Sequence, residues 1–369
     1  MNKPIFVTQP LLPPLEEFIP YLEKIWDNKI LTNGGEMHQL LEERLAEFLG
    51  VDFISLFSNG TIALITALKA LDIKGEVITT PYSFVATAHS LLWNHISPVF
   101  ADISEDSLNI NPDAIEKAIS DKTQAIMPVH VYGNPCDVHR INEIAEKYKL
   151  KVIYDAAHSF AVDYKGSSIL KYGDLSVLSF HATKIFNTFE GGAIICNTLE
   201  MKKHIDDLKN FGFRNETTVV EAGINGKMSE ISAAFGLLQL DHFELSQKRR
   251  SEISKRYIDG LEDIVGIQLK RGSNSDYISP NNSYFPILIT EKFKISRDDL
   301  YFKLRERNIY ARRYFYPLIS SFEMYKNIPS SSAANLPVAT KISNQILCLP
   351  IYPNLENKDV DKIISTIRE

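Results

Sequence analysis

Short apolar runs alternate with amphipathic segments along the first two thirds of the chain. Continuous apolar runs of this length suit strands that are covered on both faces of a sheet. The amphipathic stretches Pro112–Ser120 and Asp137–Tyr148 predict helices between them. The runs that predict buried strands are EVITT (76–80), SPVFAD (97–102), QAIMPVH (124–130), KVIYDAA (151–157), SVLSFH (176–181) and AIICN (193–197). Alternation of this kind predicts an α/β fold with a mostly parallel central sheet, and ligands bind at the carboxyl ends of such strands.

The pattern changes in the last third of the chain. Residues 239–260 are rich in charge and helix formers and predict one long connecting helix. After it, a strand over 282–290, a helix over 297–308 and a strand over 309–315 predict a small α+β domain. We therefore expect a large domain at 1–240, which includes an N-terminal substrate-loop segment, and a second unit at 241–369.

Composition narrows the classes of function. The chain has 369 residues, 44% of them hydrophobic and 23% charged, with a formal net charge of −6. This balance is typical of a globular protein, and the acidic excess argues against nucleic-acid binding. Residues 77–101 carry no charge but contain prolines and polar side chains, so we expect strand, loop, helix and strand rather than a membrane span.

The cysteines indicate the redox state of the compartment in which the protein functions. The chain has three cysteines, which is an odd number, and they are widely spaced with no CxxC pair: Cys136, Cys196 and Cys348. They therefore predict a reducing compartment and no zinc site. The N-terminal segment lacks the apolar core of a signal peptide. We expect a cytoplasmic protein without a membrane partner or a metal.

The first candidate for chemistry is Ser58-Asn59-Gly60-Thr61, between a strand-like ISLF and a helical TIALITALKAL. A strand, a tight glycine turn and a helix start leave backbone N–H groups where a phosphate can bind. Thr61 adds a hydroxyl donor. An ordinary helix N-cap could have the same four residues, so this motif alone does not establish a phosphate site.

Two further candidates lie at the ends of neighbouring predicted strands. Asp155 ends KVIYD, where its carboxylate could hold a cationic group, although an Asp there could also be a helix cap. His158 follows and could reach the same ligand, or be a structural histidine. Lys184 closes SFHATK after the next strand, which also carries Ser179. A lysine amine becomes a nucleophile only when it is desolvated or forms an imine, and this setting favours desolvation.

Many motifs in order resemble one family. LTNGGEMHQLLEERLAEFLG, SNGT, PYSFVATA, PVHVYGNPCD, DAAHSFAVDY, SFHATK with EGGA, GINGKMSEISAAFG, ARRYFYPL and CLPIYP together span nearly the whole chain. The chain is similar to the DegT-type sugar-nucleotide aminotransferases. That resemblance implies the aspartate-aminotransferase-like fold type I, the cofactor pyridoxal 5′-phosphate and a homodimer with active sites at the subunit interface.

The resemblance also implies roles for single residues. Lys184 would join the cofactor as a Schiff base and later move the proton, and Asp155 would pair with the pyridinium nitrogen. Phe84 would stack on the ring and His158 would contact its phenolic oxygen. The phosphate would be held by Gly60, Thr61, Ser179 and, from the partner subunit, Asn225. The implied contacts with the substrate are Thr32, Asn33, Lys227, Arg312, Arg313, Tyr314 and Tyr316.

The loop HATKIFNTFEGGA narrows the expected reaction. It is most similar to members that transfer an amino group from L-glutamate to C4 of dTDP-4-keto-6-deoxyglucose, giving dTDP-4-amino-4,6-dideoxyglucose. The expected pathway is the synthesis of a surface polysaccharide such as O-antigen, or of a glycosylated metabolite. A transaminase acting at C3, or on UDP- or GDP-sugars, remains open. A sugar dehydratase of the same fold would carry histidine in place of Lys184, and a regulatory protein that binds the cofactor without catalysis is the remaining alternative.

Overall fold

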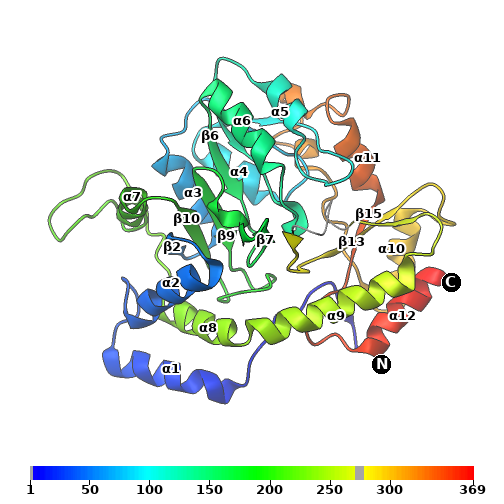
Figure 1. Ribbon diagram of the computed structural model, residues 1–369, viewed down its shortest axis with the longest axis horizontal. Helices are drawn as coiled ribbons and strands as arrows, with labels where there is room; N and C mark the ends of the chain where they lie inside the picture. The colour runs from blue at the N-terminus through cyan, green and yellow to red at the C-terminus, as the bar shows by residue number, and fades with distance from the viewer. Residues whose placement is uncertain (1–2, 271–277) are drawn as a thin grey trace.

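A seven-stranded sheet forms the centre of the protein in a computed structural model that describes residues 3–270 and 278–369 (Figure 1). The order across the sheet is β2-β10-β9-β6-β5-β3-β4. β10 runs antiparallel to both of its neighbours, and the pairs from β9 to β4 are all parallel. The strands are β2 (Phe53–Phe57), β3 (Glu76–Thr79), β4 (Ser97–Phe100), β5 (Thr123–Met127), β6 (Lys151–Asp155), β9 (Leu175–Ser179) and β10 (Gly192–Cys196). The predicted mostly parallel sheet is confirmed.

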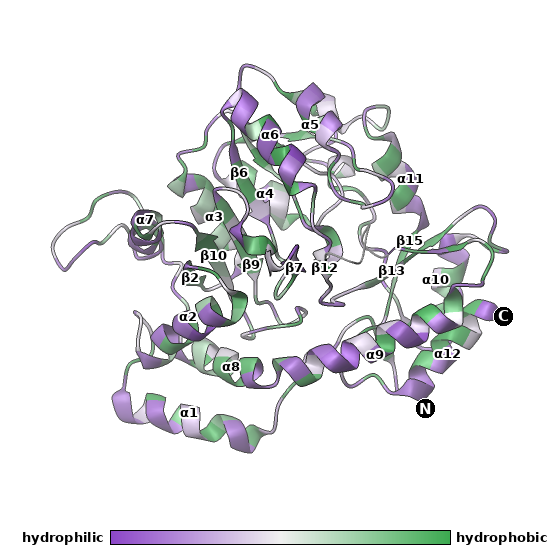
Figure 2. Cartoon of the chain, viewed as in Figure 1, coloured by the Kyte–Doolittle hydropathy of each residue, from purple (hydrophilic) through white to green (hydrophobic). Residues whose placement is uncertain are grey.

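Helices on both faces of this sheet bury its apolar side chains. Ile126, Leu178 and Ala193 of the strands lie in one apolar core, and Val77, Val177 and Ile194 lie in another. Hydrophobic positions accordingly concentrate along the strands, and the outward faces of the helices are hydrophilic (Figure 2). The helices of this part are α1 (Leu15–Asn28), α2 (Glu36–Leu49), α3 (Gly60–Ala70), α4 (Ala86–Trp93), α5 (Pro112–Ala118), α6 (Val138–Tyr148), α7 (Leu199–Lys209) and α8 (Glu230–Asp241).

The uncharged stretch over 77–101 forms β3, a loop, the half-buried α4 and β4, in the predicted order. Its polar side chains are satisfied internally. Ser90, for example, donates to the carbonyl of Thr87. In the part of the chain that the structure describes, no helix is both long and apolar enough to cross a bilayer.

The predicted connecting helix over 239–260 is two helices. α8 ends at Asp241, His242 is non-helical, and α9 (Phe243–Leu261) continues toward the C-terminal part (Figure 1). The prediction of one helix was wrong at its start, because the backbone leaves the helical conformation at His242 (φ −97°, ψ 1°). Nearly every side chain of α8 is buried, whereas α9 is amphipathic. The two helices therefore differ in environment, since α8 is buried on nearly all sides and α9 on one face.

The C-terminal part has its own core around a small antiparallel sheet with the order β11-β13-β15. Its elements are β11 (Ile267–Leu269), β13 (Phe285–Ile289), α10 (Arg297–Glu306), β14 (Ile309–Tyr310), α11 (Pro337–Gln345), β15 (Ile346–Leu349) and α12 (Asn357–Arg368). The N-terminal β1 (Ile5–Phe6) pairs in parallel with β14, and Ile5 is buried in the same core. The division of the chain near residue 240 stays a prediction.

The strand predicted over 309–315 ends at Tyr310, so that prediction was wrong beyond the second residue. Its partner β1 is only two residues long, and after it Arg312 makes a single bridge with Cys348. The chain then turns toward the central sheet, where Tyr314 and Phe315 pack. The remaining short elements are β7 (Asp163–Tyr164), β8 (Ser167–Ser168), β12 (Ile278–Ser279) and the 3₁₀ turns at 131–133, 169–171, 319–321 and 329–331.

Candidate active site

A cavity of about 790 Å³ opens at the carboxyl ends of β6 and β9, which are neighbours in the sheet. This is the edge at which parallel sheets bind ligands. The cavity brings together eight of the residues that the sequence singled out: Gly60, Thr61, Phe84, Asp155, His158, Ser179, Lys184 and Tyr314. They come from strand ends and loops spread over more than 250 positions of the chain (314 − 60 = 254).

Asp155 is a buried carboxylate at the last position of β6. Its Oδ2 accepts a hydrogen bond from the Thr87 hydroxyl at 2.7 Å, and its Oδ1 accepts from the Ala157 N–H at 3.1 Å. Burial raises the pKa of Asp155, while these two hydrogen bonds and the nearby charge of Lys184 pull the pKa down. The carboxylate is thus fixed in orientation, and a cationic ligand group would favour its charged form.

Lys184 lies in the loop after β9, where its N–H donates to the His181 carbonyl at 2.8 Å and closes a tight turn. The side chain is half-buried in the cavity wall. Burial lowers its pKa to about 8, and the charge of Asp155 offsets only part of that effect. A sizeable fraction of this amine is therefore unprotonated near neutral pH, as a nucleophile or proton carrier requires.

His158 is held as a neutral ring. Its Nδ1 accepts a hydrogen bond from the Tyr132 N–H at 3.2 Å, so its proton is on Nε2. Burial lowers its pKa well below the usual value, and the charge of Lys184 adds to this. The ring stacks on Phe315 and meets the edge of Tyr284. A neutral ring with Nε2–H can donate to an oxygen of a bound ligand.

The other end of the cavity is built to hold an anion. Asn59 caps α3 by accepting from the Ile62 N–H at 2.8 Å, and in the described residues the N–H groups of Gly60 and Thr61 have no protein acceptor. A Cβ at Gly60 would lie 3.0 Å from the Cβ of Ser179, so any larger residue would have to push α3 away from β9 by a few tenths of an ångström. The two free N–H groups and the Ser179 hydroxyl thus form a cradle at the start of a helix.

The cavity does not contain every predicted substrate contact. Arg313 Nη1 lies 2.8 Å from Asp298 Oδ1, and its guanidinium stacks on Tyr301, which is outside the cavity. Tyr316 also lies outside and is covered by Arg297. Arg312 is exposed and does not line the cavity.

Four more predicted residues lie on exposed segments of the same chain. Thr32 and Asn33 are exposed in the loop before α2, and Asn225 is exposed in the segment before α8. Lys227 is half-exposed, with its ammonium over the Phe211 ring. None of them lines the cavity within its own chain.

Sequence reasoning missed several side chains of the site. Thr87 orients Asp155 but is hidden in the helical run VATAHS, where nothing distinguishes it from a core threonine. Tyr284 and Phe315 line the cavity from segments that read as strand interior, and Trp93 lines its mouth from α4. For Phe315 the available signal was its place inside the aromatic segment ARRYFYPL, between Tyr314 and Tyr316.

Known proteins show what this architecture is similar to. Residues 15–368 match the DegT/DnrJ/EryC1/StrS aminotransferase family. A dTDP-4-amino-4,6-dideoxy-D-glucose transaminase of Shigella dysenteriae is 58% identical over the full length of both chains. One of Escherichia coli with the same activity is 54% identical, over 98% of this chain and 97% of its own. The solved structure of DesI in the presence of its TDP-sugar product superposes with a TM-score of 0.94 at 31% identity, over 100% of this chain and 93% of that one.

Proposed function

Because this chain belongs to the DegT/DnrJ/EryC1/StrS aminotransferase family, we propose that it transfers an amino group to dTDP-4-keto-6-deoxy-D-glucose. The product would be dTDP-4-amino-4,6-dideoxy-D-glucose, and L-glutamate would be the amino donor. Two relatives with this activity align over almost their whole length at more than half identity. The observation that carries the proposal is the cavity that joins Lys184 to Asp155 and to an anion cradle.

The cavity residues fit pyridoxal 5′-phosphate. A ring with a protonated nitrogen needs a fixed carboxylate, which Asp155 supplies with its two hydrogen bonds. A phosphate carrying about −1.5 to −2 charges needs several donors. Within residues 3–270 and 278–369, the N–H groups of Gly60 and Thr61 and the Ser179 hydroxyl donate to no protein acceptor and can serve this purpose. Phe84 lines the mouth with an exposed ring that could cover the cofactor.

The chemistry follows from what each side chain does. When bound, the cofactor's conjugated ring draws electrons from the carbon next to the transferred nitrogen, so that a proton there can be removed. Lys184 Nζ would accept that proton and return it, since its pKa lies near 8. Asp155 would keep the ring nitrogen protonated, and neutral His158 would donate its Nε2–H to the phenolic oxygen.

A lysine at position 184 also separates this proposal from the dehydratase alternative, in which histidine would replace it. The dehydratase cannot return its cofactor to a lysine-bound form. The half-buried setting and lowered pKa of Lys184 support a reactive amine rather than a structural one.

We also propose that the enzyme is a homodimer of the cytoplasm. Large apolar side chains such as Leu31, Phe211 and Ile224 are exposed beside the segments that carry Thr32, Asn33, Asn225 and Lys227. A second copy that covered these side chains would bring the four polar residues toward its own cavity. Among the described residues no carboxylate pairs with the exposed guanidinium of Arg312, which could therefore reach a substrate diphosphate.

An amine-transfer assay tests the proposed function. Purified protein with pyridoxal phosphate and L-glutamate is offered 4-keto and 3-keto deoxysugars linked to dTDP, UDP and GDP, and NMR locates the new amine. We expect turnover with the dTDP 4-keto sugar and an equatorial amine at C4. Preferred amination at C3, or of a UDP- or GDP-sugar, would contradict the substrate, and absence of any transfer would contradict the enzyme.

A further inference from the structure

Two exposed segments of the chain meet at one buried carboxylate. The loop 29–35, which carries Thr32 and Asn33, runs beside the start of α8, which follows Asn225 and Lys227. The Glu230 N–H donates to the Leu31 carbonyl at 3.0 Å and ties the two together. Glu230 is only 2% exposed, although it stands between two exposed segments.

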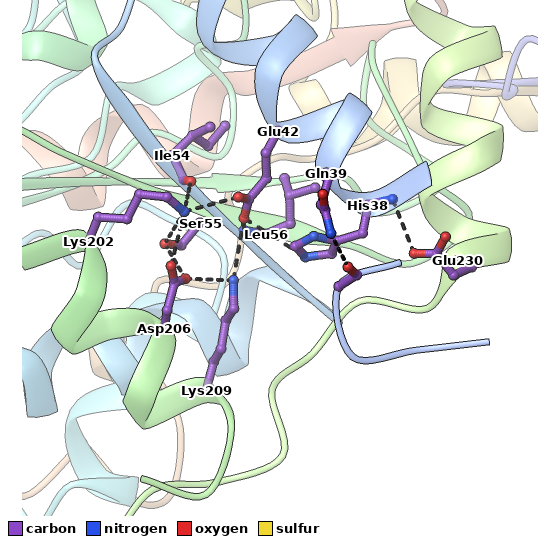
Figure 3. Close-up of polar contacts among 11 residues, drawn as sticks. His38, Gln39, Glu42, Ile54, Ser55, Leu56, Lys202, Asp206, Lys209 and Glu230 are labelled. Atoms are coloured by element: carbon purple, nitrogen blue, oxygen red, sulfur yellow. Dashed lines mark hydrogen bonds and ion pairs between the residues drawn. The ribbon is translucent and has the colours of Figure 1, made fainter. Parts of the chain in front are cut away.

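The carboxylate of Glu230 caps another helix. Its Oε2 accepts from the Met37 N–H at 2.8 Å. Its Oε1 accepts from the His38 N–H at 3.1 Å (Figure 3). Both donors belong to the first turn of α2, where the helix itself offers no acceptor. Gly35, the residue before α2, has no side-chain cap of its own. A negative charge at this helix end is favourable, so Glu230 fixes where the loop ends and the helix begins.

The fit around this carboxylate leaves no spare room. A Cβ at Gly35 would lie 2.6 Å from the Glu230 carboxyl carbon and 2.8 Å from a methyl group of Ile30. Gln39 Nε2 donates to the Gly34 carbonyl at 2.6 Å and holds the loop from the other side (Figure 3). The α2 end of the loop is thus fixed, and the Leu31 carbonyl is held by the Glu230 N–H, while the side chains of Thr32 and Asn33 stay exposed.

The segment on the other side of Glu230 is also anchored. The Gly226 N–H donates to the Lys209 carbonyl at 2.9 Å, and the Gly226 carbonyl accepts from the Ser58 N–H at 2.8 Å, next to the anion cradle. Lys209 itself bonds Asp206 and Glu42, and Glu42 is on α2 (Figure 3). The segment that carries Asn225 and the helix that Glu230 caps therefore share one framework.

We propose that Glu230 is a positioning residue that acts in trans, setting both exposed segments for the cavity of a second copy of this chain. This inference rests on the proposed homodimer and adds to it a single residue that couples Thr32 and Asn33 to Asn225. Its loss would loosen both groups of contacts at once, although Glu230 itself touches neither cofactor nor substrate.

The first test compares Glu230→Ala, Gly35→Ala and the control Asp137→Ala, which removes the carboxylate that caps α6 on the outside of the molecule. We expect Glu230→Ala and Gly35→Ala to weaken cofactor retention and raise the KM for the sugar nucleotide by roughly 10- to 100-fold. Deuterium exchange at residues 29–39 should quicken in both, whereas Asp137→Ala should keep wild-type binding. Unchanged cofactor affinity and KM in Glu230→Ala would overturn the inference.

The second test separates trans from cis action. Hybrid dimers of a Glu230→Ala chain and a Lys184→Ala chain, isolated with two affinity tags, contain one cavity with Lys184. That cavity faces a partner with an intact Glu230, and the visible absorbance of the lysine-bound cofactor reports on it alone. We expect wild-type cofactor affinity and about half the wild-type turnover per dimer. Affinity that stayed as weak as in Glu230→Ala, or a monomeric protein, would refute trans action.

The proposed function and this inference fail in different ways. If wild-type protein aminates no sugar, the proposed function falls, and the cofactor titration and deuterium exchange of the same hybrids still decide the role of Glu230. If wild-type protein is active but the hybrid is not restored, only the inference falls.

Discussion

Two places in the molecule take lysines out of water, and they treat them in opposite ways. In the buried cluster between α2, β2 and α7, Lys202 Nζ lies 3.0 Å from Glu42 and 3.1 Å from Asp206. Burial lowers the pKa of Lys202, but the two carboxylates outweigh it and the net pKa is raised. In the cavity, Asp155 offsets burial only in part, and the pKa of Lys184 falls to about 8. Pairing, more than burial, decides which lysine can react.

The geometry of the carboxylates explains the difference. The cluster balances Glu42 and Asp206 against Lys202 and Lys209, so every charge has an opposite charge within 3.4 Å. In the cavity, the oxygens of Asp155 instead accept hydrogen bonds from two uncharged donors, the Thr87 hydroxyl and the Ala157 N–H. Its carboxylate therefore remains available to a ligand cation, and the amine of Lys184 remains free to give up its proton.

The largest expected effect follows from removing the reactive lysine. Lys184→Ala should lower amino transfer by roughly 10³-fold or more, because it removes both the nucleophile and the proton carrier. The protein should also lose the visible absorbance that borohydride abolishes in the wild type. Lys202→Ala, matched in charge and size, should keep that absorbance per folded molecule. An unchanged spectrum in Lys184→Ala would remove this residue from its role.

Asp155→Ala should have the next largest effect. It should weaken cofactor retention and reduce amino transfer by roughly 10²- to 10³-fold, because the ring nitrogen loses its anionic partner. Thr87→Val removes only the hydroxyl that orients Asp155 and should cost roughly tenfold or less. Equilibrium titration with the cofactor and steady-state rates measure both. Near-normal turnover in Asp155→Ala would contradict the assignment of this carboxylate.

Glu42→Gln should affect stability rather than chemistry. It leaves Lys202 and Lys209 with Asp206 alone, and removing one partner of a buried ion pair costs about 3 kcal/mol. Urea unfolding followed by circular dichroism measures the loss, with the exposed Glu43→Gln as control. Turnover per folded molecule should change less than twofold. A stability equal to that of wild type would mean that the cluster contributes nothing.

The smallest and most specific effect is on pH dependence. The amine with a pKa of about 8 is the neutral, reactive form only above that value. The rate at which the cofactor-free protein captures pyridoxal phosphate should therefore rise roughly tenfold from pH 6 to pH 7 and less than twofold from pH 8 to pH 9. Stopped-flow absorbance follows the reaction. A rate that kept climbing tenfold per unit beyond pH 9 would show that Lys184 resembles Lys202.

The sequence was informative where chemistry follows strand order. Asp155 and Lys184 end neighbouring parallel strands or follow them directly, and such ends share one edge of a sheet, so their meeting could be predicted. The glycine turn before α3 was also predictable, because its own residues specify a local backbone conformation. These features depend on short stretches of chain.

Features that depend on distant partners could not be predicted. Thr87 reaches Asp155 across 68 positions, and nothing in its own helix marks it. From the sequence, Arg313 could bind a diphosphate or an aspartate equally well. In the structure its guanidinium donates to Asp298, fifteen positions earlier in the chain. The break at His242 is likewise not marked by a glycine or a proline in the sequence.

The pairing of β1 with β14 has a consequence for how the protein is made. Ile309 is synthesised 304 positions after its partner Ile5 (309 − 5). At about 5–20 residues per second, Ile5 waits about 15–60 s before its strand can pair. During translation the C-terminal core must therefore incorporate a segment that was synthesised long before the rest of that core.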